Sequence, residues 1–207
     1  MLSLSHNFLF IHVPKTAGNA IQGALSAYAD DNIVRLAPHQ DGIERFEVRS
    51  AVYATVKHST LADYRREYGE DLSGRLYKFC GVRNPWDRCI SHFFSPHRGR
   101  ISWDRQAFLE FVAAEVRPLR HYITADPNNR DPLSACVANM NCVIRYESLQ
   151  ADFESACRSI GIPHVVVLPR RNASEKDDYA KYYDSASAAV IADSFAEEID
   201  YFGYSHP

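Results

Sequence analysis

The fold is decided by the stretch Asn7-Phe-Leu-Phe-Ile-His-Val-Pro-Lys15-Thr-Ala-Gly18-Asn-Ala-Ile21. Its apolar first half is typical of a central parallel strand that helices cover on both faces. Pro14 ends this strand, Gly18 allows the backbone to turn, and Asn19 can cap the helix that follows. Backbone N–H groups at the start of that helix and the Lys15 ammonium would then point to one place. The stretch therefore predicts an anion-binding loop between a strand and a helix.

The order of residues in this loop differs from that in the Walker loop of nucleotide kinases. The Walker lysine follows the last glycine, as in G-x-x-x-x-G-K-[ST], whereas Lys15 precedes Gly18. The kinase pattern is therefore not met. A glycine loop with one lysine also occurs as a purely structural turn between a strand and a helix, so the loop alone leaves both interpretations open.

Length and charge restrict the class of protein. With 207 residues, of which 46% are hydrophobic, the chain predicts one folded domain over residues 1–207 with one sizeable core. The net charge of −3 argues against a general nucleic-acid binder, because such proteins draw most of their affinity from a basic surplus. Any anion site must therefore be local.

The cysteines and the apolar segments indicate the compartment. Five cysteines, an odd number, show no C-x-x-C or other metal-ligand spacing, so we expect reduced thiols in the core and no metal site. The first residues lack a basic segment followed by a long apolar run, and no window approaches the roughly 20 apolar residues that span a bilayer. These patterns predict a cytoplasmic protein without a signal peptide or membrane span.

The remaining patterns alternate between strands and helices. Further strands are expected at residues 33–36, 51–56, 76–82, 142–146 and 164–168, and helices at residues 61–68, 85–94, 104–116, 147–160 and 184–202. This alternation predicts a three-layer α/β fold, with four or five mostly parallel strands and a ligand at their carboxyl edge. His58 would follow the second of these further strands at that edge. The proline-rich and asparagine-rich residues 118–132 are expected to form an acceptor-binding or lid segment.

A second motif reads Gly81-Val-Arg83-Asn-Pro85-Trp-Asp-Arg88-Cys-Ile-Ser91. It predicts a strand that ends in an arginine, followed by a helix with Asn84 as its cap and a polar face formed by Asn84, Arg88 and Ser91. A guanidinium grips phosphate with a charged fork, and a serine hydroxyl adds a directional donor. The alternative is that Arg83 pairs with Asp87 and Ser91 faces solvent.

Both motifs resemble the nucleotide loops of sulfotransferases that use 3′-phosphoadenosine-5′-phosphosulfate (PAPS). The segment Pro14-Lys-Thr-Ala-Gly18 is similar to their 5′-phosphosulfate loop, and Arg83 with Ser91 is similar to their 3′-phosphate loop. Residues 145–153 and 182–204 extend the similarity through nearly the whole chain. The resemblance is strongest to carbohydrate O-sulfotransferases of the heparan and chondroitin type and their bacterial relatives. It implies a P-loop-like nucleotide-binding fold.

The resemblance also implies a reaction and a site. A sulfuryl group would pass in line from PAPS to a hydroxyl acceptor, a carbohydrate, while Lys15 stabilises the leaving phosphate and His58 acts as the general base. His12 is expected only to pack or to bond the backbone, and His92 is a weaker candidate base. No metal is implied. The expected donor-binding residues are Lys15, Thr16, Ala17, Gly18, Asn19, Ala20, Arg83, Ser91, Tyr146 and Arg171. Tyr146 and Trp86 are each open to a second interpretation, as core residues.

One departure keeps other functions open. The family loop usually continues Gly-Thr-Ser, whereas this chain has Gly18-Asn19-Ala20 and so lacks two hydroxyls. A catalytically impaired nucleotide-binding protein is therefore one alternative, and a P-loop-like phosphotransferase that needs Mg²⁺ is another. The sequence specifies neither the acceptor nor the oligomeric state.

Overall fold

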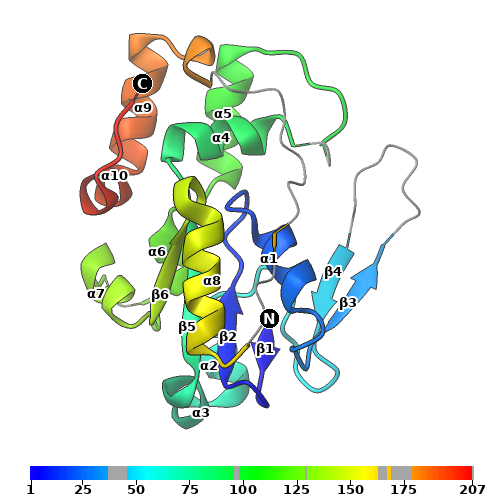
Figure 1. Cartoon of the computed structure of the whole chain (residues 1–207). Coiled ribbons are helices and arrows are strands. Elements are labelled where there is room, and N and C mark those ends of the chain that lie inside the picture. The colour runs from blue at the N-terminus through cyan, green and yellow to red at the C-terminus, as the bar shows by residue number, and fades with distance from the viewer. Residues whose placement is uncertain (37–45, 96–97, 129, 163–166, 169–178, 207) are drawn as a thin grey trace.

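The computed structural model describes residues 1–36, 46–95, 98–128, 130–162, 167–168 and 179–206 (Figure 1). Within these residues the strands are β1 (Leu2–Ser3), β2 (Phe8–Ile11), β3 (Asn32–Arg35), β4 (Phe46–Arg49), β5 (Tyr77–Val82) and β6 (Cys142–Arg145). The helices are α1 (Gly18–Leu25), α2 (Leu61–Tyr68), α3 (Glu70–Arg75), α4 (Pro85–Phe93), α5 (Arg105–Glu115), α6 (Leu119–Ile123), α7 (Leu133–Ala138), α8 (Leu149–Ser159), α9 (Ser185–Ser194) and α10 (Ala196–Phe202). The described residues also include the short 3₁₀ turns η2 (Tyr146–Ser148) and η3 (Tyr179–Tyr182).

The central sheet has the strand order β1-β2-β5-β6. The pairs β2–β5 and β5–β6 are parallel, with Phe10 opposite Phe79 and Gly81 opposite Ile144, whereas the short edge strand β1 is antiparallel to β2. The expected α/β fold with a mostly parallel sheet is therefore confirmed. Because β2, β5 and β6 run the same way, the loops that follow them meet at one edge of the sheet.

Helices cover both faces of this sheet, as the alternation predicts. On one face, side chains such as Phe10 and Phe79 pack against Ile21 of α1 and Phe153 of α8. The opposite face buries a larger cluster, which includes Tyr64 of α2 and residues of α4, α5, α6, α7 and α9. Figure 1 shows α8 crossing in front of the sheet and the β3–β4 hairpin standing beside it.

Local capping explains where several helices begin. Thr60 caps α2, because its hydroxyl accepts from the Asp63 N–H while the Asp63 carboxylate accepts from the Thr60 N–H. Asn84 caps α4 through its bond to the Trp86 N–H, and Pro85 occupies the first helical position. Both starts agree with the sequence prediction.

Two predicted elements are wrong. Residues 51–54 form bends, and in the described structure residues 51–56 pair only through an isolated bridge between Arg49 and Val56. Their β-branched and aromatic side chains favour a strand, but no neighbouring strand pairs with them. The tail is not one helix over residues 184–202, because α9 ends at Ser194 and α10 begins at Ala196. The intervening Phe195 is buried and packs over the Arg88 guanidinium.

Other predictions have mixed outcomes. Of residues 33–36, the first three belong to β3, which pairs antiparallel with β4 outside the main sheet. The strand expected at residues 164–168 lies mostly outside the described residues. None of the five cysteines forms a disulfide, and Cys142 is the half-buried exception to an otherwise buried set. Across the described chain, every helix is too short or too polar to span a membrane.

Candidate functional site

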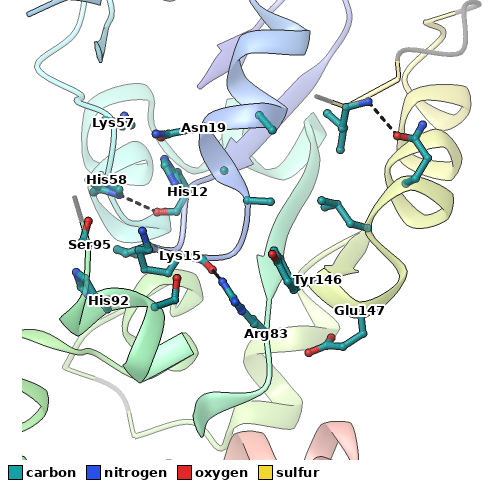
Figure 2. Close-up of a pocket in the computed structure, with 18 of the residues that line it drawn as sticks. His12, Lys15, Asn19, Lys57, His58, Arg83, His92, Ser95, Tyr146 and Glu147 are labelled. Carbon is teal, nitrogen blue, oxygen red and sulfur yellow. Dashed lines mark hydrogen bonds between the residues drawn. The ribbon is translucent and has the colours of Figure 1, made fainter. Parts of the chain in front are cut away.

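A cavity of about 820 Å³ lies at the carboxyl ends of β2, β5 and β6, where the sequence predicts a ligand site. Figure 2 shows Arg83 and Tyr146 on one side of Lys15, and His12, Lys57 and His58 on the other. Among the described residues its lining consists of His12, Pro14, Lys15, Ala17, Gly18, Asn19, Ala20, Lys57, His58, Arg83, Ser91, His92, Ser95, Arg98, Tyr146, Glu147, Leu149, Gln150, Val167 and Leu168. Its volume lies within the range of small-molecule sites.

The loop between β2 and α1 turns at Lys15 and Ala17, which have φ angles of 68° and 67°. Both residues thus adopt the left-handed conformation that residues with a side chain seldom occupy. Ala17 also precedes α1, and its carbonyl accepts from the Ala20 and Ile21 N–H groups. The expected roles of Gly18 in the turn and of Asn19 as the cap are therefore wrong. The first turn of α1 still faces the cavity, and its leading N–H groups lack carbonyl partners within the helix.

Gly18 is required for close packing instead of for turning. A Cβ built on Gly18 would lie 2.0 Å from Cδ2 and 2.2 Å from Nε2 of His12, closer than any side chain could sit. Gly81 of β5 has the same function toward Thr16, since its Cβ would lie 2.4 Å from the Thr16 hydroxyl. These contacts press the loop onto the ends of two adjacent strands.

Thr16 is placed differently from the other loop residues. Its side chain is fully buried and donates a hydrogen bond of 2.9 Å to the Val13 carbonyl. It does not line the cavity. The hydroxyl thus holds the loop together, and any contact of Thr16 with a ligand would come from its backbone.

Arg83, at the end of β5, joins the two predicted loops. Its Nε and Nη2 donate to the two carboxylate oxygens of Asp87 at 2.7 Å each, and its Nη1 donates to the Lys15 carbonyl at 3.1 Å. The guanidinium also stacks on the Tyr146 ring, 3.9 Å from its centroid. The Arg83–Asp87 pair considered as an alternative is thus present, yet both Arg83 and Ser91 line the cavity.

His58 reaches the cavity from the segment before α2, and the strand that was predicted just before it, at residues 51–56, does not form. Its Nδ1 lies 3.2 Å from the His12 carbonyl, and the two imidazole rings lie 4.4 Å apart. Burial lowers the pKa of His58 below its usual 6.5, although its bond to the His12 carbonyl opposes this shift. His58 is therefore neutral at pH 7, the state that a proton acceptor needs.

Several lining residues were not predicted. Lys57 is almost buried, lies over the Phe46 ring and donates to the Phe46 carbonyl, and burial lowers its pKa to about 8. His92, which was expected only as a weaker candidate base, also lines the cavity; burial lowers its pKa to about 4, and nearby Lys15 adds to that shift. The sequence signal that could have identified Lys57 as a lining residue is its position next to His58. Arg98 and Glu147 carried none that a single sequence reveals.

Other predicted residues lie elsewhere. Trp86 is buried and donates through its indole N–H to the Ala188 carbonyl, so it belongs to the core. Arg88 is fully buried beside Glu198, and its place on a polar helix face is therefore wrong. No described residue of the 118–132 segment lines the cavity, and its residues 119–123 form α6. Arg171 lies outside the described residues.

A strand–loop–helix turn at the carboxyl edge of a mostly parallel sheet, with an arginine following the neighbouring strand, is typical of α/β proteins that bind phosphate-bearing ligands. The sequence model of the sulfotransferase family matches residues 1–205, and the chain therefore belongs to this family. An uncharacterized protein of Archaeoglobus fulgidus is 26% identical over 118 residues, which are 56% of this chain and 93% of the relative. No solved structure matches the chain.

Family membership implies a PAPS-dependent sulfotransferase. Within the described part of the chain, no group of three or more histidine, cysteine, aspartate or glutamate side chains is arranged to hold a metal ion.

Proposed function

We propose that this chain, as a single domain over residues 1–207, transfers a sulfuryl group from PAPS to a hydroxyl group of a carbohydrate. The observation that carries the proposal is the meeting of the two loops. Arg83 donates to the Lys15 carbonyl within one cavity, and His58 lies on the opposite wall. PAPS carries phosphate groups at the 3′ and 5′ positions of its ribose, so it needs two such anion sites in one cavity.

The charge of the cavity supports an anionic donor. Of the five N–H donors on a guanidinium, Arg83 uses three for Asp87 and the Lys15 carbonyl, so two remain for a phosphate. Glu147 is the only acid among the described lining residues, and its two oxygens accept from the Asn84 N–H and the Tyr204 hydroxyl. The acid that faces the donor site thus has protein partners already.

The proposed donor set is drawn from both loops. Lys15 and the first turn of α1, with Ala17, Gly18, Asn19 and Ala20, would hold the 5′-phosphosulfate. Arg83 and Ser91 would hold the 3′-phosphate, and Tyr146 would contact the adenine. Thr16 would contribute only through its backbone, and Arg171 remains a member of the set on family resemblance alone.

In the proposed reaction the acceptor oxygen attacks the sulfur as its proton passes to Nε2 of His58. The bond between sulfur and the bridging phosphate oxygen breaks, and the Lys15 ammonium stabilises the negative charge that develops on that oxygen. His58 suits this step because its Nδ1 is engaged with the His12 carbonyl, which leaves Nε2 as the proton-accepting nitrogen.

The test is transfer of radiolabelled sulfate from PAPS to a library of glycans and small hydroxyl compounds. Lys15→Ala and His58→Ala are each expected to lower kcat by about 100-fold or more, the usual worth of a charge-stabilising or acid–base group. Lys181→Ala and His121→Ala, outside the described lining, serve as controls and should match the parent. A His58→Ala variant with full turnover would overturn the assignment of the base.

Two further outcomes would select the alternatives. Binding of 3′-phosphoadenosine-5′-phosphate (PAP) without transfer to any acceptor would indicate an impaired enzyme, a reading that the Asn19 and Ala20 departures keep open. Turnover of ATP that depends on Mg²⁺ would indicate a phosphotransferase. Transfer to non-carbohydrate hydroxyls alone would leave the sulfotransferase intact and refute the acceptor class.

A further inference from the structure

His12 follows β2 directly and is almost completely buried, although it lines the cavity. Its ring lies against the position where Gly18 has no side chain, and it stacks on Phe10 at a centroid distance of 6.1 Å. On its other side it contacts the His58 ring. The ring is therefore held between the core and the loop, and this packing fixes the backbone of His12.

Among the described residues, the carbonyl of His12 accepts the one hydrogen bond of the His58 ring. A carbonyl oxygen accepts and never donates, so Nδ1 of neutral His58 carries the proton and Nε2 carries the lone pair. An imidazole without this partner would exchange between its two tautomers and would turn about its side-chain bonds. The bond therefore sets both the tautomer and the orientation of His58.

We infer that His12 is a positioning residue for His58: its packed ring holds the carbonyl that fixes the tautomer and orientation of the base. The inference rests on the proposed function, in which His58 accepts the acceptor proton. His12 acts through its shape, because its own Nδ1 is buried without a hydrogen-bond partner in the structure. His12 itself takes no part in the proton transfer.

The charges around the pair are compatible with this assignment. Burial lowers the pKa of His12 well below 6.5, and neighbouring His58 and Lys57 add to this effect, so His12 stays neutral. Lys57 and Glu47 also face His58, where Lys57 lowers the pKa and Glu47 raises it. Because the His12 ring is neutral, it does not repel the positive charge that His58 gains when it takes up a proton.

The first test reads the tautomer directly. Nitrogen-15 NMR of the parent at neutral pH is expected to show His58 protonated at Nδ1 and bare at Nε2, and His12→Ala is expected to show a mixture of tautomers. His6→Ala, outside the cavity lining, is the control for removing a histidine. A parent His58 protonated at Nε2 would overturn the inference, whatever the enzyme transfers.

The second test is a double-mutant cycle on kcat with His12→Ala and His58→Ala. His12→Ala alone is expected to lower kcat about tenfold or more, since small misplacements of a reacting group cost up to 10²-fold. In the His58→Ala background it should have no further effect on kcat. An equal loss in both backgrounds would show a general structural role and refute the inference.

Phenylalanine separates shape from chemistry. His12→Phe keeps a flat ring on Gly18 and should retain the parent kcat and its pH profile, whereas a loss as large as that of His12→Ala would show that a ring nitrogen is needed. Should a substitution at residue 12 unfold the protein, the tautomer measurement on the parent still decides. If the parent protein transfers no sulfate, the proposed function is refuted. The NMR measurement would still test whether His12 positions His58.

Discussion

Arg83, which precedes α4, pairs with Asp87 in its first turn, with Nε–Oδ2 and Nη2–Oδ1 distances of 2.7 Å each. A carboxylate that occupied the whole guanidinium would compete with any phosphate for Arg83. Asp87 orients the fork instead, because two of the five N–H donors stay unused after the bonds to Asp87 and the Lys15 carbonyl. The pair therefore prepares Arg83 for an anion in the cavity.

Arg83 should contribute to donor affinity more than to the transfer step. Arg83→Ala is expected to weaken PAP binding by about 10- to 100-fold, the worth of one or two charge-assisted hydrogen bonds. Arg83→Lys should recover only part of this loss, because an ammonium lacks the planar fork. Calorimetry measures both, with the exposed Arg66→Ala on α2 as the control. Equal PAP affinity in Arg83→Ala and the control would contradict this role.

Lys57 should set the pH range of activity. Its ammonium lowers the pKa of His58, after the larger effect of burial. In the proposed reaction His58 acts as a base only when neutral, so activity is expected to fall as the pH drops through the His58 pKa, which lies below 6.5. Lys57→Met removes the charge, which raises that pKa and moves the acid limb of the kcat profile to higher pH. Lys181→Met should leave the limb in place, and a shift toward lower pH in Lys57→Met would refute the assignment.

The C-terminal segment should support the donor site. The Tyr204 hydroxyl donates to Oε2 of Glu147 at 3.1 Å, while Oε1 of Glu147 accepts from the Asn84 N–H at the start of α4. Tyr204→Phe is expected to raise the donor KM about fivefold, the effect of one lost hydrogen bond, with kcat unchanged. Tyr201→Phe, whose side chain is exposed, is the matched control. A fall in kcat with an unchanged KM would contradict a role in donor binding.

Stability should depend strongly on Glu198. This carboxylate is 1% exposed, lies 3.4 Å from Nη2 of Arg88 and accepts from the Leu119 N–H. Glu198→Ala leaves the Arg88 charge buried without its partner, so the free energy of unfolding is expected to fall by about 3–5 kcal/mol. The adjacent Glu197→Ala removes an exposed ion pair with Arg120 and should cost less than about 1 kcal/mol. Urea denaturation measures both, and equal losses would refute the account.

The sequence predicted those parts of the fold that local signals determine. The apolar run before Pro14, the Thr60 capping box and the Asn84-Pro85 start each carry their own pattern, and the structure has β2, α2 and α4 at these places. Residues 51–56 had strand composition, but strand formation depends on a partner that only the tertiary structure supplies. Helical periodicity predicted that Arg88 lies on a polar face. The local sequence carries no sign that Arg88 is buried beside Glu198, 110 residues away.

Only part of the candidate site was predicted from the sequence. Lys15 and Arg83 come from recognisable motifs, whereas His58 was chosen by family resemblance as following a strand that does not form; all three line one cavity. His12 was expected to lie within the apolar strand and only to pack or to bond the backbone. The structure places it at the strand end, where one side of its ring meets the core and the other meets His58. Its contact with Gly18 depends on how the loop folds back, which spacing along the chain does not encode.

The central claim is that the Lys15 loop and Arg83 hold opposite ends of one donor molecule. Calorimetric titration of PAP into the parent, Arg83→Ala, Lys15→Ala and the double variant tests it most directly. The account predicts binding of one PAP per chain in the parent, weaker binding in each single variant and the weakest in the double variant. Absence of heat with the parent, or the same affinity in all four proteins, would contradict it.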